Sequence, residues 1–148
     1  MSTQVFPAHF DQLDAIREYV GKFARSRGLV DRDVYAVQLA VDEACSNIIE
    51  HAYEGIHDGQ IEVSCEDHRG RLTVSLLDWG KPFDPAVVSD PDLSDDLSER
   101  QVGGLGIFLM RKMMDDVKYQ SVPGRGNLLE LVKRHRRSKS KPGKKGRK

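Results

Sequence analysis

The sequence predicts an α+β fold, a two-layer α/β sandwich in which helices cover one face of a mixed, mainly antiparallel sheet. Two long segments near the N-terminus carry apolar residues at steps of three and four, which indicates helices. Two later segments alternate apolar and polar residues around short turns, which indicates hairpins. Each such element has one apolar face to bury, so the two sets are expected to form facing layers. The chain has 148 residues, which is enough for one domain and too few for two.

The N-terminal third is expected to hold a strand and two helices. The strand covers residues 4–6, at an edge of the sheet, and Pro7 breaks it. The first helix begins near residue 11 and ends at Gly28. The second helix begins at Asp31, the expected N-cap, and runs to about Glu54. Its inward face is expected to carry Val34, Val37, Val41, Ala44, Ile48 and Ala52.

The rest of the domain is expected to hold two hairpins, a long loop and a third helix. Residues 61–77 form the first hairpin around the turn HRGR, and residues 117–132 form the second around PGRG. Residues 86–102 are polar, acidic and without periodicity, which is long for a connection in a compact domain. The third helix opens at GGLG, residues 103–106.

The formal net charge of zero hides an uneven distribution. Residues 133–148 hold ten Lys or Arg and no acid, so the first 132 residues carry thirteen basic against 23 acidic side chains. A segment of like charge with Pro, Gly and Ser cannot bury apolar area, so we expect a domain over 1–132 and a disordered tail over 133–148. The tail is either a solvated extension or a contact for nucleic acid or an acidic protein surface.

Cysteine spacing and hydropathy indicate an intracellular protein. Cys45 and Cys65 have no metal-type spacing and fall in apolar segments, which favours two buried thiols in a reducing cytoplasm. The sequence contains no apolar leader and no run of about 18 apolar residues. We therefore expect a cytoplasmic protein that does not contact the membrane.

The first candidate motif lies in the second helix. Glu43 and Asn47 are four residues apart, so their side chains lie on one face of the helix, opposite the apolar face. Asn is a mediocre helix former because its amide competes for nearby backbone groups, so an interior Asn needs solvent or a ligand. Considered alone, the polar face is either solvated or part of a site.

Two further motifs follow it along the chain. Asp78 and Gly80 come directly after a strand, where a carboxylate can accept a hydrogen bond from an amino group and a glycine leaves room for a flat ligand. The same pattern also occurs in ordinary turns. GGLG at a helix start can present backbone N–H groups to an anion, or act as a hinge. It is not the GxxxxGK[ST] of a P-loop enzyme.

In order and spacing, EACSNIIEHAYE, DWGKPFDP and GGLGIFLMRKMMD resemble the nucleotide-binding boxes of the GHKL ATPase superfamily. They are most similar to the bacterial anti-sigma-factor serine/threonine kinases. The resemblance covers about residues 5–133 and implies the Bergerat ATP-binding fold. It also implies that ATP and Mg²⁺ bind, with Asn47 as the Mg²⁺ ligand and Glu43 as the general base that takes the proton of the substrate hydroxyl.

The resemblance further assigns the remaining site. It implies that Asp78 binds the adenine amino group, that Gly80 leaves room for the ring, and that residues 86–102 form a lid over ATP. The phosphates would meet the backbone of Gly103, Gly104, Leu105 and Gly106, and Arg100 would lie near the γ-phosphate. Leu129 stands where many relatives carry a threonine near the adenine.

The implied function is a kinase with two protein partners. The enzyme would transfer the γ-phosphate of ATP to a Ser or Thr of a STAS-type anti-sigma factor antagonist, and would alternately sequester a sigma factor. The resemblance also implies a homodimer. The alternative is an ATP-dependent protein-binding switch with little or no kinase activity; the retained Glu43 favours the kinase, because a pure binder needs no base beside the metal.

Overall fold

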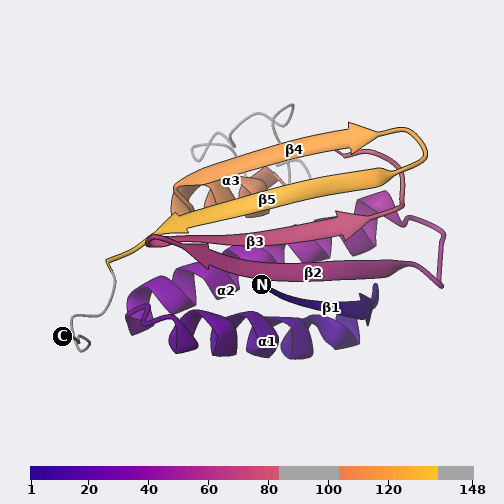
Figure 1. The fold of residues 1–148 in the computed structure, drawn as a ribbon. Coiled ribbons are helices and arrows are strands. Elements are labelled where there is room, and N and C mark those ends of the chain that lie inside the picture. The colour runs from indigo at the N-terminus through magenta and orange to yellow at the C-terminus, as the bar shows by residue number, and fades with distance from the viewer. Residues whose placement is uncertain (84–103, 137–148) are drawn as a thin grey trace.

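The computed structural model describes residues 1–83 and 104–136, which form two layers. The strands are β1 (Ser2–Pro7), β2 (Gln60–His68), β3 (Arg71–Asp78), β4 (Asp116–Val122) and β5 (Gly126–Arg134). They form one sheet in the order β1-β2-β3-β5-β4, and all four pairings are antiparallel. Helices α1 (Leu13–Ser26), α2 (Asp31–Asn47) and α3 (Gly104–Met113) lie together on one face of the sheet (Figure 1). The predicted α+β sandwich is confirmed.

The core lies between the two layers. All six residues predicted for the inward face of the second helix are buried, as are the inward residues of the central strands, Ile61, Val63, Leu72, Val74 and Leu76. Cys45 and Cys65 are both free and buried, and burial raises the pKa of the Cys65 thiol to about 12. Buried thiols of raised pKa behave as small apolar groups, as the sequence predicted.

Both ends of α2 differ from the prediction. Val30 occupies the N-cap position and no side chain caps the helix, so Asp31 is the first helical residue rather than the cap. Asp31 and Asp33 instead place negative charge in the first turn, where the helix dipole favours it. At the other end the α-helix stops at Asn47 and continues as one π-helical turn, η2 (Ile48–Ala52). The Tyr53 N–H closes this turn on the Ile48 carbonyl at 3.0 Å.

Strand β5 extends past the expected end of the domain at residue 132. It pairs with β3 as far as Arg134, and the His135 N–H donates to the Gly70 carbonyl at 2.8 Å. The His135 ring is buried beside Asp67, with Nε2 3.0 Å from Oδ1. The first residues assigned to the tail therefore pack against the sheet, while residues 137–148 lie outside the described part of the chain. No helix within 1–83 or 104–136 has the length and apolar character needed to span a membrane.

Candidate functional site

Asn47 lies where α2 changes from an α-helix to a π-turn. Its side chain is only 8% exposed, and Nδ2 donates to the Glu43 carbonyl oxygen at 2.9 Å. A side-chain donor on a helix carbonyl competes with the backbone, and this contact lies directly before the π-turn. Because Nδ2 is occupied, the Oδ1 oxygen of Asn47 is the atom that remains for a ligand or a cation.

Glu43 lies one turn before Asn47 and beside α3. A Cβ added to Gly106 would meet Oε2 of Glu43, so a larger residue there would require the Glu43 carboxylate to move. Burial raises the pKa of Glu43, and the negative charge of Asp42 raises it further. A carboxylate of raised pKa is a better proton acceptor than an ordinary glutamate once it is ionised.

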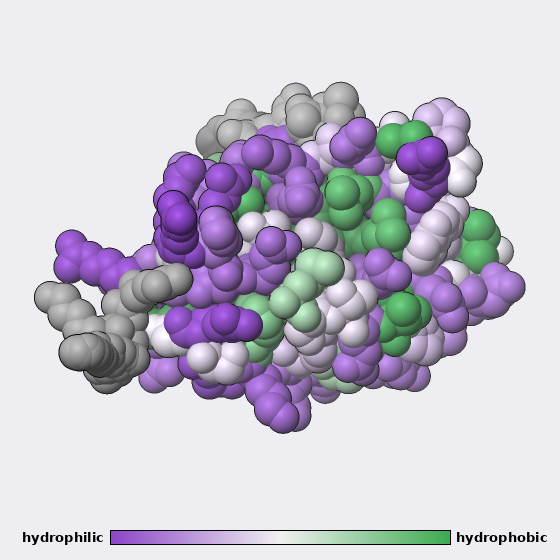
Figure 2. Space-filling model, viewed as in Figure 1, coloured by the Kyte–Doolittle hydropathy of each residue, from purple (hydrophilic) through white to green (hydrophobic). Residues whose placement is uncertain are grey.

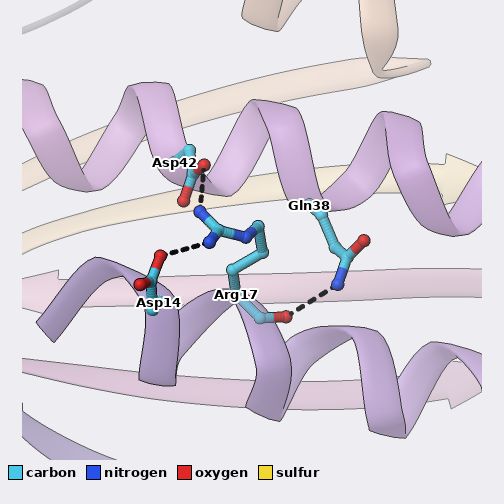
Figure 3. A network of polar contacts seen from close by, with 4 residues as sticks. All are labelled: Asp14, Arg17, Gln38 and Asp42. Carbon is cyan, nitrogen blue, oxygen red and sulfur yellow. Dashed lines mark hydrogen bonds and ion pairs between the residues drawn. The ribbon is translucent and has the colours of Figure 1, made fainter.

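An ion-pair network holds Asp42 beside this glutamate (Figure 3). Arg17 on α1 donates from Nη1 to Oδ2 of Asp42 at 2.7 Å and from Nη2 to Asp14. Gln38 on α2 donates to the Arg17 carbonyl at 3.1 Å. The network joins α1 to α2 and keeps a compensating positive charge next to Asp42. Asp42 Oδ1 is buried and has no hydrogen-bond partner in the part of the chain that the structure describes.

Asp78 lies at the end of β3 and is 4% exposed. Its Oδ1 accepts two hydrogen bonds, from the Gly80 N–H at 2.9 Å and from Asn127 Nδ2 at 2.8 Å. Burial raises the pKa of this carboxyl, and the two hydrogen bonds oppose that rise. Both donors bind one oxygen, so Oδ2 is available to accept a hydrogen bond from a ligand amino group.

Asn127, which holds Asp78, is a candidate residue that the sequence did not single out. It stands directly opposite Asp78 in the β3–β5 register and is 3% exposed. Its Nδ2 also donates to the Gly80 carbonyl at 2.9 Å, and its Oδ1 accepts from the Ser121 hydroxyl at 2.6 Å. The available signal was a polar residue at a buried position of an alternating strand, two residues before Leu129.

Gly80 packs against the end of the π-turn. A Cβ at this position would collide with the Ala52 carbonyl, which also accepts the Lys81 N–H at 2.8 Å. The glycine is therefore required by a backbone contact, in addition to any room that it leaves for a ligand. Trp79 is 49% exposed, so its ring does not cover the core.

One pocket joins the two motifs. Both Asn47 and Asp78 line it; its enclosed space is about 20 Å³, and the rest of the hollow is open to solvent. The other lining residues come from α2, α3 and the strands, and are largely apolar: Ala44, Ile48, Ala52, Phe83, Ile107, Met110, Tyr119 and Leu129. A mostly apolar pocket with a few convergent polar groups is typical of a site for a flat organic ligand.

Aromatic and hydroxyl groups fix the rim of this pocket. Tyr119 accepts the Phe83 N–H at 2.9 Å, and the Phe83 ring stacks on His51 with ring centroids 4.8 Å apart. His51 Nε2 is buried and without a partner among the described residues. The Tyr53 hydroxyl donates to the Gln60 carbonyl at 2.6 Å and accepts the Trp79 N–H at 2.8 Å, which fixes the segment after Asp78.

The glycine motif is described only in part. Gly104 and Leu105 open α3 as expected, and Gly106 follows beside Glu43. Gly103, Arg100 and the expected lid at 86–102 lie outside the described residues. Within those residues no group of three or more His, Cys, Asp or Glu could hold a metal ion. The structure thus brings together Glu43, Asn47, Asp78 and Gly106 from three separate elements.

Comparison with known proteins gives one consistent result. Residues 6–133 match the family described as Histidine kinase-like ATPase domain. The chain is 34% identical over 138 residues to the serine-protein kinase RsbW of Bacillus velezensis, covering 84% of each chain. It is also 34% identical over 119 residues to the RsbW of Listeria monocytogenes, covering 72% of this chain and 75% of that one.

Solved structures share the fold at low sequence identity. The RsbU and RsbW domains of a Mycobacterium tuberculosis protein align with a TM-score of 0.62 and 16% identity, over 90% of this chain and 32% of that one. A mycobacterial sensor histidine kinase aligns with a TM-score of 0.54 and 13% identity, over 93% of this chain and all of that one. At this identity the structural likeness shows the fold alone.

Proposed function

The chain belongs to the histidine kinase-like ATPase domain family, and we propose that it is an ATP-dependent serine/threonine protein kinase of the anti-sigma type. Its similarity to serine-protein kinases extends over most of both chains. The observation that carries the proposal is the pairing of a half-buried glutamate with a buried asparagine one helical turn later, beside a pocket that ends at a buried aspartate. A protein that only binds a nucleotide has no need of the glutamate.

Asp78 and Asn127 are proposed to hold the adenine. The ionised Asp78 accepts a hydrogen bond from the adenine amino group on Oδ2, while Asn127 and Gly80 keep Oδ1 in place. Ala52, Ile107 and Leu129 supply the apolar walls on either side of the ring. The raised pKa of Asp78 means that acidification protonates this carboxyl at a higher pH than an ordinary aspartate, and nucleotide affinity then falls.

Asn47 is proposed to bind Mg²⁺ through Oδ1. The residues present fit this ion, because Mg²⁺ commonly takes only one or two protein oxygens and completes its shell with phosphates and water. When bound, the ion would neutralise charge on the ATP phosphates. The backbone of α3 from Gly104 is proposed to meet the same phosphates at a helix N-terminus.

Glu43 is proposed to act as the general base. It takes the proton from a substrate Ser or Thr hydroxyl while that oxygen forms a bond to the γ-phosphorus and the bond to ADP breaks. The rate should therefore fall on acidification, starting at a higher pH than for an unperturbed glutamate, because the pKa of Glu43 is raised. Asp42 is next to Glu43 in the sequence, and its ion pair with Arg17 partly neutralises the negative charge beside Glu43.

The proposed partners follow from the resemblance. The substrate is a small STAS-type anti-sigma factor antagonist, and a sigma factor is bound in alternation with it. The site of action is proposed to be the cytoplasm, and the homodimer implied by the resemblance stays a prediction.

The test is transfer of labelled phosphate. Purified protein is incubated with γ-labelled ATP, Mg²⁺ and extract from its own source cell, and acid-stable phosphate on small proteins is measured. We expect one labelled band with the wild type and with Glu50→Gln, which neutralises an exposed glutamate in the π-turn. Glu43→Gln should lower the rate by about 10² to 10⁴ while ATP affinity, measured by calorimetry, stays near the wild-type value.

Two results would decide against the kinase. Equal labelling by Glu43→Gln and Glu50→Gln would remove Glu43 as the base. No labelling at all, with a partner retained on the immobilised protein only in the presence of ATP, would instead establish a nucleotide-gated binding module.

A further inference from the structure

A group of exposed arginines lies at the end of the sheet opposite the pocket. Arg69 lies in the turn between β2 and β3, and Arg71 is the first residue of β3. Arg134 is the last residue of β5, Arg136 follows it, and Arg32 lies in the first turn of α2. We call these five residues the arginine end. Arg32, Arg134 and Arg136 line one surface groove together with Val30, Asp33 and His135. In Figure 2 hydrophilic side chains gather on this side of the molecule, where the chain leaves toward its C-terminus.

The charges of the arginine end are not neutralised locally. Among residues 1–83 and 104–136, none of its five side chains forms an ion pair or a side-chain hydrogen bond. Of the nearby acids, Asp33 lines the same groove without an ion pair to these arginines among the described residues, Asp67 pairs with His135, and Asp115 accepts the backbone N–H of Arg134 at 2.6 Å. Arg71 and Arg134 even stand directly opposite each other in the β3–β5 register, an arrangement that is unfavourable without a bound anion.

The arginine end is held in place by the fold. His135, between Arg134 and Arg136, is fixed by its buried contact with Asp67 and by the hydrogen bond from its N–H to the Gly70 carbonyl. The arginines of the hairpin and of β5 therefore project from a rigid base rather than from a free chain end. A preorganised group of cations loses less entropy on binding than mobile ones do.

The arginine end is also distinct from the candidate nucleotide site. Arg71 and Arg134 pair at one end of the β3–β5 ladder, and Asp78 and Asn127 pair at the other. Arg71 and Asp78 are seven positions apart on β3, which at about 3.3 Å per residue is about 23 Å. A ligand of the arginine end therefore does not bind in the pocket.

We propose that the arginine end binds the phosphates of duplex DNA without sequence preference. A stable protein partner would need apolar or aromatic anchors, and residues 133–148 contain none, while the groove offers only Val30. A single strand would need aromatic side chains for base stacking, which are likewise lacking there. Arginine forks match phosphate oxygens, and phosphate contacts alone give affinity without reading sequence.

The test uses the full-length chain and a short labelled DNA duplex, with binding measured by fluorescence anisotropy between about 50 and 200 mM salt. The variant Arg32→Gln/Arg71→Gln/Arg134→Gln removes three charges from the arginine end. The matched control Lys22→Gln/Arg25→Gln/Arg125→Gln removes three exposed charges elsewhere. Both variants should bind ATP and unfold thermally much as the wild type does.

The expected result separates the two variants. The arginine-end variant should bind DNA about tenfold more weakly or worse, with the slope of log affinity against log salt reduced by about three, while the control changes both values little. Two duplexes of unrelated sequence should bind equally. Equal binding by both variants would overturn the proposal. So would tighter binding of the wild type to polyglutamate or to phosphatidylserine vesicles than to DNA.

Discussion

The two ends of the β3–β5 ladder place opposite chemistry on the same pair of strands. At one end Asp78 and Asn127 are buried, and their polar atoms are hydrogen-bonded to each other and to Gly80. At the other end Arg71 and Arg134 are exposed and face each other with like charge. The first pair can distinguish the shape and hydrogen-bonding pattern of a ligand, whereas the second can only attract negative charge. The buried pair can therefore recognise a specific ligand, whereas the exposed pair attracts anions of any shape.

The largest expected effect comes from changing the carboxylate at the buried end. Asp78→Asn keeps the shape of the side chain and one acceptor oxygen. It replaces the other oxygen, which is offered to the ligand amino group, with an amide nitrogen that donates. The new amide donor would then face the adenine amino group, also a donor, and this unmatched buried contact lowers ATP affinity by about a hundredfold. Titration calorimetry with ATP and ADP measures this, and Asp58→Asn, an exposed acid in the loop before β2, should be neutral. Equal affinities for the two variants would show that Asp78 does not contact the nucleotide.

The next effect concerns how closely the buried end is packed. Gly80→Ala forces the segment after Asp78 away from the Ala52 carbonyl, which costs about 1–3 kcal/mol of unfolding free energy. Gly55→Ala is the comparison: its cost comes from the positive φ of that glycine alone, because open space surrounds it. Chemical denaturation should show the larger loss for Gly80→Ala, with a matching loss of ATP affinity. A smaller loss of unfolding free energy in Gly80→Ala than in Gly55→Ala would mean that the backbone moves away from the added methyl group at little energetic cost.

The hydrogen bond from Asn127 should be visible in the pH dependence of ATP binding. Asn127→Leu removes a donor that lowers the pKa of Asp78, so burial then raises this pKa further. ATP affinity should fall about tenfold at neutral pH, and on acidification its decline should begin at a higher pH than in the wild type. Ser121→Ala, which removes only the hydroxyl behind Asn127, should shift the curve less. An unchanged pH curve in Asn127→Leu would show that Asn127 does not affect the pKa of Asp78.

The smallest effect tests the exposed end. Arg71→Thr removes one of two facing charges and places a residue of good strand propensity on β3, so the free energy of unfolding should rise by about 0.2–1 kcal/mol. The gain should shrink in high salt, because salt screens exposed charges. Denaturation at low and high salt measures both. A loss of stability at low salt would mean that Arg71 has a compensating partner.

The sequence predicted those parts of the fold that depend on local periodicity. The inward residues of α2 repeat every three or four positions, so the buried face could be identified without a structure. Asp78 could be predicted because it directly follows an alternating strand. Asn127 could not, since its importance comes from standing opposite Asp78, 49 residues away, and that register is set by the whole sheet.

The remaining differences also come from contacts between distant segments. Helix propensity predicts neither the π-turn after Asn47 nor the side-chain bond from Asn47 to the Glu43 carbonyl that precedes it. Gly80 was predicted as a small residue beside a ligand, which stays a prediction; the structure adds its close contact with the Ala52 backbone. The basic tail was evident from composition, whereas its continuation into Arg32 and Arg71 required the pairing of strands far apart in the sequence.

A crystal structure with Mg²⁺ and a nonhydrolysable ATP analogue would test most directly the claim that the buried end is the nucleotide site. The adenine amino group should lie within hydrogen-bond distance of Asp78 Oδ2, and Asn47 Oδ1 should be about 2.1 Å from the ion. Glu43 should lie beside the γ-phosphate, and the arginine end should hold no nucleotide. A nucleotide bound away from Asp78, or its phosphates at the arginine end, would contradict the account.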